Sequence, residues 1–249
     1  MTPLRFPRAA AAWLVLLTAG FCTTVSDQAS ADGLGIGRLA PAGAAAARIG
    51  ALFSGGDHFC TASVVDSPAG NLVITAAHCL SGGASGVSFA PGYRAGTAPY
   101  GSWPVTAVVV DDAWSQDEDE DHDVAFAVLG PDSQGRSVQQ VVGAEEFDAE
   151  TDPAAAAAAE PVSLTGYPDG DDDPITCRNL VDHYSATQLR IACTGYTDGT
   201  SGSPWLLGDR VVGVIGGFEQ GGATPDVSYS VRFGTDAAVL YAQAVTGSR

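Results

Sequence analysis

Short apolar stretches separated by Gly, Pro, Asp and Ser recur along the chain from residue 49 onward. This spacing is typical of β-strands joined by tight turns. It predicts strands at residues 49–53, 58–65, 72–75, 87–90, 105–110, 124–129, 138–142, 161–167, 175–181, 188–193, 204–207, 210–218 and 226–233. The pattern changes at residues 235–245, where a cap residue is followed by a stretch without a breaker, and there it predicts one helix.

The sequence therefore predicts an all-β fold of antiparallel barrels with a C-terminal α-helix. Between Asp152 and Pro161, six consecutive alanines predict a connector, so the link between two barrels should lie near residues 143–161. Residues 32–48 are rich in Gly, Ala and Pro with little periodicity, which is typical of a linker or a short pro-segment. Arg48-Ile49 is either a processing site or the start of the first strand, so we expect the folded domain to span residues 49–249.

The N-terminus has the pattern of a secretory signal. Arg5 and Arg8 precede an apolar core at residues 9–19, which is too short to span a membrane. Ala29-Ser30-Ala31 is a suitable cleavage site. The sequence predicts a signal peptide at residues 1–31 and an exported protein with no membrane attachment after cleavage.

Composition narrows the function classes. With 45% hydrophobic and 16% charged residues in 249, the chain should form a globular fold with a substantial core. The 29 acidic residues outnumber the 11 basic ones, all arginine, to give a net charge of -18. A field of that sign repels phosphate backbones, so we expect no nucleic-acid partner. It suits cationic or neutral substrates, or only keeps an exported protein soluble.

Cysteine usage agrees with export. Four cysteines remain outside the predicted signal: Cys60, Cys79, Cys177 and Cys193. An even number in an exported chain predicts two disulfides, of which the sequential pairing is the simplest of three, and Cys177 and Cys193 could tie a hairpin. The alternative, a zinc site that adds His58 and His78, fits no common ligand spacing. We therefore expect no metal and no cofactor.

Three stretches carry candidate chemistry. His78 ends the apolar run that starts at Val73, and it could act as a general base. In Asp198–Pro204, glycines flank Thr200-Ser201, so a serine hydroxyl and the amides of Gly199 and Ser201 can approach a substrate closely. Asp123 directly precedes a buried strand, where its carboxylate can face an imidazole. Asp121 is the rival, but it does not directly precede that strand.

Together these stretches resemble the chymotrypsin/trypsin-like serine proteases. Thr75-Ala76-Ala77-His78-Cys79, Asp123-Val124-Ala125-Phe126 and Gly199-Thr200-Ser201-Gly202-Ser203-Pro204 are similar to three motifs of that family, in the same order. The resemblance covers roughly residues 49 to 245. It implies two β-barrels with the active site in the cleft between them.

The resemblance also implies roles for individual residues. Ser201 would attack the scissile carbonyl, His78 would take and return its proton, and Asp123 would fix the imidazole tautomer. The amides of Gly199 and Ser201 would hold the oxyanion. The segment Ile215-Gly216-Gly217 would pair with the substrate backbone, Gly195 and Tyr196 would lie near the primary pocket, and Cys60 would pair with Cys79.

Two positions depart from the family pattern. Thr200 replaces the aspartate that pairs with a newly cut N-terminus in the trypsin branch, so we do not expect activation at Arg48-Ile49 by that route. A neutral residue here resembles the glutamyl-endopeptidase-like branch of exported bacterial enzymes. Gly216 occupies the position where many members have a serine that supports the aspartate.

The leading hypothesis is a secreted, monomeric serine endopeptidase that acts on protein or peptide substrates. Two alternatives are a catalytically silent binding module, motivated by Thr200, Gly216 and the acidity, and a secreted esterase that uses the same acyl transfer. The acidic run at residues 117–123 is expected to be a solvated loop, with calcium binding as the alternative. We expect His58, His122 and His183 to be structural or solvent-facing.

Overall fold

The computed structural model describes residue 1, residues 33–156 and residues 160–248. The predicted signal peptide therefore lies outside the described residues, except for its first residue. Within the described part of the chain, no helix is both long and apolar enough to cross a membrane.

The first half of the protein is a closed barrel. Its strands are β2 (Ile49–Ser54), β3 (Asp57–Val65), β4 (Leu72–Thr75), β5 (Val87–Pro91), β6 (Trp103–Val110) and β7 (Ala125–Leu129). They close in the order β2-β3-β4-β7-β6-β5, and every neighbouring pair is antiparallel. Closure leaves no unpaired edge in this half.

Residues 124–129, which include strand β7, form a continuous apolar run because side chains on both faces are buried. Ala125, Ala127 and Leu129 join the core inside the barrel, with Leu52, Phe89 and Trp103. Val124, Phe126 and Val128 point the other way, into a second core that includes residues of the second half and of the C-terminal helix. Because alternate side chains face opposite sides of a strand, both faces of β7 are buried.

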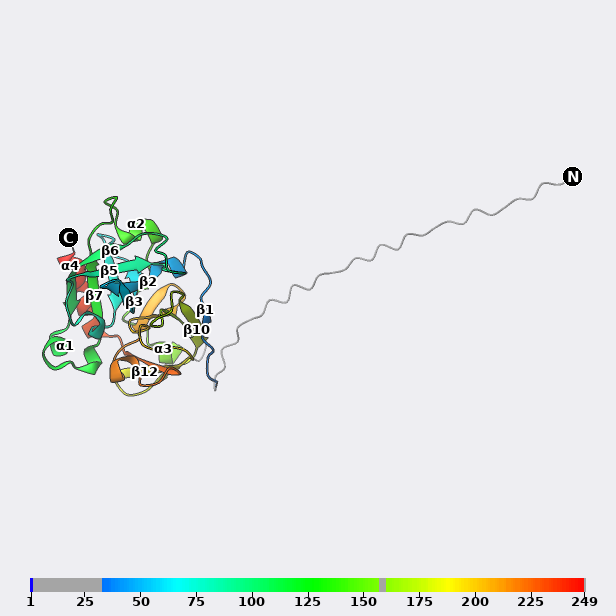
Figure 1. Ribbon diagram of the computed structural model, residues 1–249. Helices are drawn as coiled ribbons and strands as arrows, with labels where there is room; N and C mark the ends of the chain where they lie inside the picture. The colour runs from blue at the N-terminus through cyan, green and yellow to red at the C-terminus, as the bar shows by residue number, and fades with distance from the viewer. Residues whose placement is uncertain (2–32, 157–159, 249) are drawn as a thin grey trace.

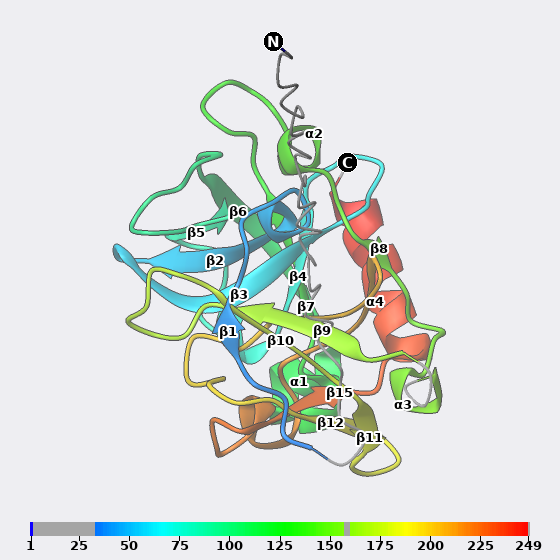
Figure 2. The ribbon, with the colours of Figure 1, turned by 90° about the vertical axis from the view of Figure 1, so that its right-hand side faces the viewer.

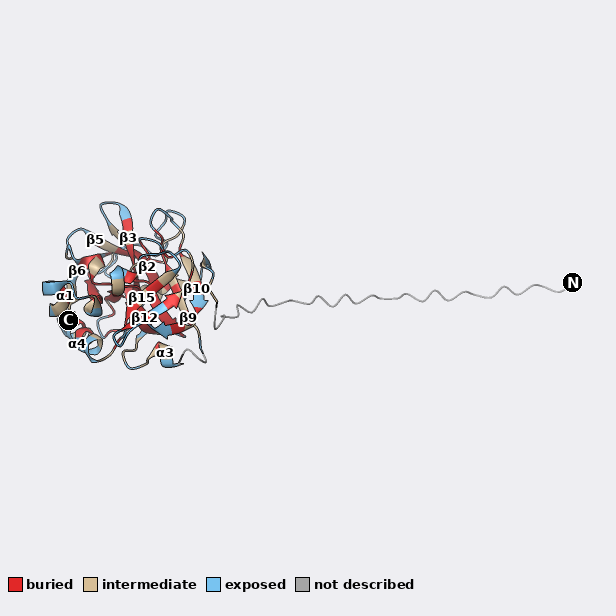
Figure 3. Ribbon diagram, turned by 90° about the horizontal axis from the view of Figure 1, so that it is seen from below, coloured by how far each residue is buried: buried red, intermediate tan, exposed pale blue. Residues whose placement is uncertain are grey.

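The second half contains two sheets (Figure 1). The larger has the order β1 (Arg38–Leu39), β10 (Ile175–Asn179), β9 (Val162–Gly166), β13 (Pro204–Leu207), β14 (Arg210–Val214) and β8 (Glu146–Phe147). The smaller consists of β11 (Val181–His183), β12 (Gln188–Ala192) and β15 (Val227–Val231). Their apolar side chains share a third core, and buried residues concentrate on the strands while exposed residues lie on peripheral loops (Figure 3).

The predicted C-terminal helix is α4 (Thr235–Gly247). Its buried residues, Leu240 and Ala244, belong to the core between the two halves. Other short helical pieces of the described residues are α1 (Asp112–Asp117), α3 (Pro153–Ala156), η1 (Ala46–Arg48), η2 (His78–Leu80), η3 (Glu120–His122) and η4 (Phe218–Gly221). The prediction of a mostly β protein with a C-terminal helix is thus confirmed.

One predicted strand is wrong. Residues Val138–Val142 form the short helix α2. Ser137 and Gln140 make a capping box, in which the Gln140 Oε1 accepts a hydrogen bond from the Ser137 amide at 3.0 Å. These reciprocal bonds satisfy amides at the start of a helix, and they outweigh the strand preference of three valines.

The segment at residues 33–48, expected to be a linker or pro-segment, makes regular contacts with the second half. In β1, Arg38 and Leu39 pair with Thr176 and Ile175 of β10 (Figure 2). Asn179 Nδ2 donates to the Gly33 carbonyl at 2.9 Å. We call residues 33–48 the N-terminal strap. The connector at residues 143–161 likewise contains β8 and α3, although the end of its alanine run, residues 157–159, lies outside the described residues.

The structure contains the two sequential disulfides. Cys60–Cys79 joins β3 to the turn that follows β4. Cys177–Cys193 does not tie a hairpin, as we had expected, because Cys177 lies in β10 of the larger sheet and Cys193 follows β12 of the smaller one. This bond therefore connects the two sheets of the second half.

Candidate active site

His78 and Asp123 meet because of how two strands pair. Strand β4 ends just before His78, β7 begins just after Asp123, and Thr75 of β4 lies opposite Ala125 of β7. The antiparallel pairing therefore brings the end of one strand to the start of the other. Asp123 Oδ2 lies 2.8 Å from His78 Nδ1, and Asp123 Oδ1 accepts from the His78 amide at 2.9 Å.

The second half supplies a further donor to this carboxylate. Asp123 is fully buried, at 0% side-chain exposure, and the Gly217 amide donates to its Oδ2 at 2.8 Å. A Cβ atom on Gly216 would lie 3.0 Å from the same oxygen and 2.9 Å from the Asp123 carbonyl. The backbone of the second half thus approaches Asp123 closely at Gly216, and the Gly217 amide is the hydrogen-bond donor that it supplies.

The loop Asp198–Ser203 is held through its carbonyl groups. The Asp198 carbonyl accepts from the Asp169 amide at 2.6 Å, and the Thr200 carbonyl accepts from the Ser203 amide at 3.0 Å and from its hydroxyl at 2.6 Å. The Gly199 amide shares a peptide group with the Asp198 carbonyl, and the Ser201 amide shares one with the Thr200 carbonyl. Because peptide groups are planar and trans, each amide points in the direction opposite to its carbonyl. Among the described residues, no backbone carbonyl accepts a hydrogen bond from either amide.

Two glycines let this loop take its shape. Gly199 and Gly202 have φ values of 84° and 80°, in the left-handed region that favours glycine. A Cβ atom on Gly199 would lie 2.6 Å from the Tyr167 carbonyl, so the position also lacks space for a side chain.

His78 and Ser201 line one cavity of about 350 Å³. His78 is 13% exposed, and Ser201 is partly buried. Of the residues expected to bind substrate, Tyr196 and Ile215 line this cavity, whereas Gly195, Gly216 and Gly217 are not among its lining residues. Tyr196 is buried with its hydroxyl donating to the Leu164 carbonyl at 3.1 Å, and burial raises the pKa of this phenol.

The other candidate residues contact different parts of the molecule. Asp121 Oδ1 accepts from Gln188 Nε2 at 2.7 Å, so the rival carboxylate is engaged elsewhere. His58 Nε2 lies 3.1 Å from the Asp171 carbonyl, His122 pairs with Asp111, and His183 pairs with Asp152.

The chain matches a family model over residues 36–235, and the model is described as Trypsin. The protein belongs to the trypsin family. No curated protein sequence matches it significantly.

Solved structures of the same fold include bacterial trypsin-family enzymes. The protease Anisep from Arthrobacter nicotinovorans has 25% identity and a TM-score of 0.69, over 80% of this chain and 96% of that one. The thermostable serine protease AL20 from an extremophilic microorganism has 29% identity and a TM-score of 0.69, over 82% and 99%. A Glu endopeptidase with 19% identity and a TM-score of 0.67, over 86% and 98%, shares the fold. The protein is thus a trypsin-family serine endopeptidase with the two-barrel architecture.

The position of Thr200 bears on activation in this trypsin-family chain. Thr200 is buried, and its hydroxyl donates to the Thr197 carbonyl at 2.6 Å, within the same loop. Ile49, at the position considered either a processing site or the start of the first strand, is buried at the start of β2 and pairs with Ser63. Thr200 therefore makes a neutral hydrogen bond within its loop, at the position where the trypsin branch is expected to have the aspartate of an ion pair.

Glu219 and Gln220 line the cavity, as expected for the region from Gly216 to Tyr229, but the sequence did not predict the strained turn that they form. Both have positive φ values, 48° and 54°, which are uncommon for residues with a side chain. The Glu219 amide donates to Glu120 Oε1 at 2.8 Å, and Gln188 Nε2 donates to the Glu120 carbonyl at 3.0 Å. The acidic run before Asp123 thus anchors this strained turn, which the Glu-Gln-Gly-Gly sequence alone does not indicate.

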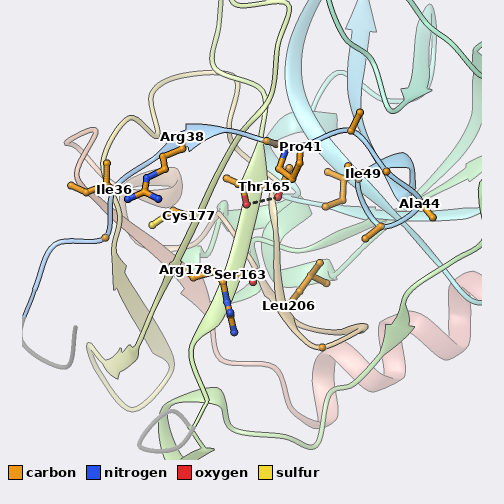
Figure 4. A pocket seen from close by; sticks show the side chains of 18 of the residues that line it. Ile36, Arg38, Pro41, Ala44, Ile49, Ser163, Thr165, Cys177, Arg178 and Leu206 are labelled. Atoms are coloured by element: carbon orange, nitrogen blue, oxygen red, sulfur yellow. Dashed lines mark hydrogen bonds between the residues drawn. The ribbon is translucent and has the colours of Figure 1, made fainter. Parts of the chain in front are cut away.

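A larger cavity lies away from this site. It measures about 660 Å³ and lies between the N-terminal strap and strands β9, β10 and β13 (Figure 4). Its lining includes Ile36 and Pro41 of the strap and Thr165 and Leu206 of the sheet. Neither His78 nor Ser201 lines it, so its size does not mark it as the catalytic cleft.

Proposed function

We propose that this protein is an exported endopeptidase that cleaves peptide bonds through an acyl-enzyme formed on Ser201. In this mechanism His78 is the general base and acid, and Asp123 orients it. The observation that carries the proposal is the position of His78. Its Nδ1 is engaged by Asp123, and the ring borders the cavity that Ser201 lines.

The hydrogen bonds to Asp123 define the tautomer of His78. A carboxylate only accepts hydrogen bonds, so Nδ1 carries the proton and Nε2 keeps its lone pair. That lone pair takes the Ser201 proton as Oγ attacks the scissile carbonyl, and the imidazolium that forms then protonates the leaving amine. A water molecule then attacks the acyl group, His78 takes its proton and returns it to Ser201 Oγ, and the acid product is released.

The amides of Gly199 and Ser201 are proposed to stabilise the tetrahedral intermediate. Neither amide has a backbone acceptor in the described part of the chain, because the hydrogen bonds that hold the loop carbonyls orient both amides away from the loop's partners. Donors fixed before the reaction need no reorganisation when negative charge develops on the substrate oxygen. Removing one such donor typically lowers kcat by about 10² to 10³.

The charge around the cavity favours neutral or cationic substrates. Asp198 and Glu219 both line it, and none of its lining residues is an arginine. Carboxylates at the mouth of a cleft attract positive side chains and repel acidic ones. We therefore expect peptides with basic residues near the cleaved bond to be preferred over acidic peptides.

Export fits the two disulfides and the predicted signal at residues 1–31. We propose that cleavage after Ala31 leaves the N-terminal strap on the mature protein, because Arg38 and Leu39 pair with β10. The mass of the secreted protein's first peptide tests this. A start at Ile49 would contradict it.

Turnover of casein and of a peptide library by the mature protein tests the proposed function. We expect cleavage that disappears in His78→Ala while the variant keeps its melting temperature within a few degrees. Absence of turnover by the unaltered protein would favour the silent binding module instead. Matched amide and ester substrates separate the endopeptidase from the esterase, since only an esterase would leave the amide uncut.

A further inference from the structure

Thr61 contacts the nucleophile loop on both sides of Ser201. It is a fully buried residue of β3. Its amide donates to the Ser201 carbonyl at 2.8 Å, and its hydroxyl donates to the Gly199 carbonyl at 3.1 Å. One residue of the first barrel therefore holds two carbonyls of a loop that belongs to the second half.

The direction of the hydroxyl bond is fixed by its partners. The Tyr167 amide donates to Thr61 Oγ1 at 3.0 Å, so the hydroxyl oxygen already accepts there. Its single hydrogen can then satisfy the Gly199 carbonyl, which can only accept. All three groups are buried, and a lost partner would leave unpaired polar atoms away from water.

Thr61 is itself held in place relative to His78. The preceding residue, Cys60, is bonded to Cys79, which follows His78 in the chain. The Thr61 carbonyl accepts from the Thr75 hydroxyl at 2.8 Å, at the end of the strand that leads to His78. Thr61 thus connects the strand that positions the histidine to the loop that carries the serine.

The loop needs such a restraint at Gly199. A glycine with φ of 84° can rotate its two neighbouring peptide groups with little steric penalty. The Asp169 amide holds the peptide before Gly199, and the Thr61 hydroxyl holds the peptide after it. The Thr200 amide, in the same peptide group as the Gly199 carbonyl, also donates to the Thr197 carbonyl at 3.1 Å. Without the Thr61 bond this peptide group keeps only that restraint and can rotate at Gly199, which shifts the neighbouring Gly199 amide away from the position that an oxyanion would occupy.

We propose that Thr61 is a positioning residue whose hydroxyl keeps the Gly199 and Ser201 amides in the geometry that stabilises the transition state. This inference rests on the proposed function of Ser201 and its two amides. The glycines of the loop cannot fix its conformation by themselves. The Thr61 side chain, next to the Cys60–Cys79 disulfide, supplies part of the preorganisation that is missing.

The test compares Thr61→Val, which keeps the shape and removes the hydroxyl, with Thr61→Ser, which keeps the hydroxyl. Thr106→Val is the control for the substitution itself, because the Thr106 hydroxyl donates to the Val128 carbonyl at 3.0 Å and neither residue is among those that line the cavity of Ser201. For each protein, kcat and KM are measured per active site, with active sites counted by fluorophosphonate titration. Affinities for a peptide boronic acid and for a product peptide are measured in parallel.

We expect Thr61→Val to lower kcat about tenfold or more with KM nearly unchanged. This decrease in kcat should be smaller than the decrease caused by removal of an amide donor itself. Its affinity for the boronic acid should fall by a similar factor, because that adduct mimics the tetrahedral intermediate, while product binding stays the same. Thr61→Ser should recover most of the activity, and Thr106→Val should behave like the unaltered protein.

Two results would overturn the proposal. One is an unchanged kcat and boronic acid affinity in Thr61→Val. The other is a loss in which product binding weakens as much as boronic acid binding, since that indicates a general structural defect. If the unaltered protein neither turns over substrate nor reacts with the fluorophosphonate, the proposed function fails instead, which is a separate outcome.

Discussion

Asp123 and Glu145 are both buried carboxylates beside a basic side chain, but their surroundings differ. Asp123, 0% exposed, accepts hydrogen bonds from His78 Nδ1 and from the amides of His78 and Gly217. Glu145, 1% exposed, has one side-chain partner, Arg48 Nη1 at 3.0 Å. Burial raises the pKa of Glu145 above its ordinary value, and the Arg48 charge offsets this only in part.

The difference indicates what each carboxylate does. Backbone amides around Asp123 keep it oriented and satisfied whether or not the imidazole is charged, which suits a group that must support a proton transfer. Glu145 depends on a single long side chain that crosses from the N-terminal strap to the connector between the halves. We infer that the first carboxylate serves reactivity and the second serves stability.

The largest expected effect is on catalysis by Asp123→Asn. An asparagine can donate to Nδ1 and favour the wrong tautomer of His78, so kcat should fall by about 10⁴. Glu145→Gln, the equivalent change at the other carboxylate, should leave kcat within about twofold. Steady-state kinetics on one peptide substrate checks both, and a similar loss in the two variants would remove the distinction.

The next effect is on stability, from Arg48→Met. This change leaves Glu145 buried without its charged partner, and breaking a buried pair costs about 3 to 5 kcal/mol. Arg48 is 27% exposed, so we expect the lower end of that range for the loss in free energy of unfolding. Urea unfolding measures it.

Arg190→Met is the control for that measurement. Arg190 is 51% exposed and lies 3.6 Å from Asp182, and a surface pair of this kind contributes about 0 to 1 kcal/mol. Equal losses in the two variants would contradict the role assigned to Glu145.

A smaller effect is expected from Gly216→Ala. The new Cβ would lie 3.0 Å from Asp123 Oδ2, so the carboxylate or the strand must shift. Small displacements at a catalytic group are costly, and we expect kcat to fall about tenfold. Because the new Cβ would also lie 2.9 Å from the Asp123 carbonyl, the free energy of unfolding should fall as well, by about 1 kcal/mol. Gly82→Ala, with no atom within 4 Å of its Cβ, is the control. An unchanged kcat would show that Asp123 tolerates the displacement.

The smallest effect is a dependence of stability on pH. Because the pKa of Glu145 is raised in the folded protein above its ordinary value of 4.5, the native state binds this proton more tightly than the unfolded state. Its contribution is greatest below pH 4.5 and is lost as pH rises through the folded pKa. The stability of Glu145→Gln relative to the unaltered protein should therefore increase from pH 4 to 7.

Asp148 should change stability with pH in the opposite direction to Glu145. Partial burial raises its pKa, but hydrogen bonds from Thr151, the Glu150 amide and Arg210 outweigh this and lower the pKa below its ordinary value. Its contribution is present above the ordinary value and is lost as pH falls. Relative to the unaltered protein, Asp148→Asn should therefore lose stability as pH rises toward 3.8, with little further change above that value. Thermal unfolding at several pH values checks both slopes, and parallel slopes would contradict the assignment.

Sequence reasoning succeeded where local pattern and long-range pairing agree. The strands around His78 and Asp123 are marked by apolar runs, and the C-terminal helix by an unbroken stretch after a cap residue. It failed at Val138–Val142, where a run of five residues is too short to show a period and the Ser137 capping box decided the structure. It also missed η4, because this turn depends on distant acceptors: Glu120, 99 residues from Glu219, and Gln188, 30 residues from Phe218.

The Gly217 amide illustrates the same limit. The sequence reports Gly216 as a missing serine, and only the approach of the second half to Asp123 reveals a backbone donor in its place. Hydrogen bonds from backbone atoms have no signature in residue identity, so such support can be recognised only after the fold is known.

The central claim is that Ser201 is a nucleophile activated by His78. Reaction of the mature protein with a fluorophosphonate, followed by peptide mass spectrometry, tests it most directly. We expect one adduct, on Ser201. Its rate of formation should fall strongly in His78→Ala and Asp123→Asn but not in Glu145→Gln. An adduct on another residue, or labelling of Ser201→Ala at the same rate, would contradict it.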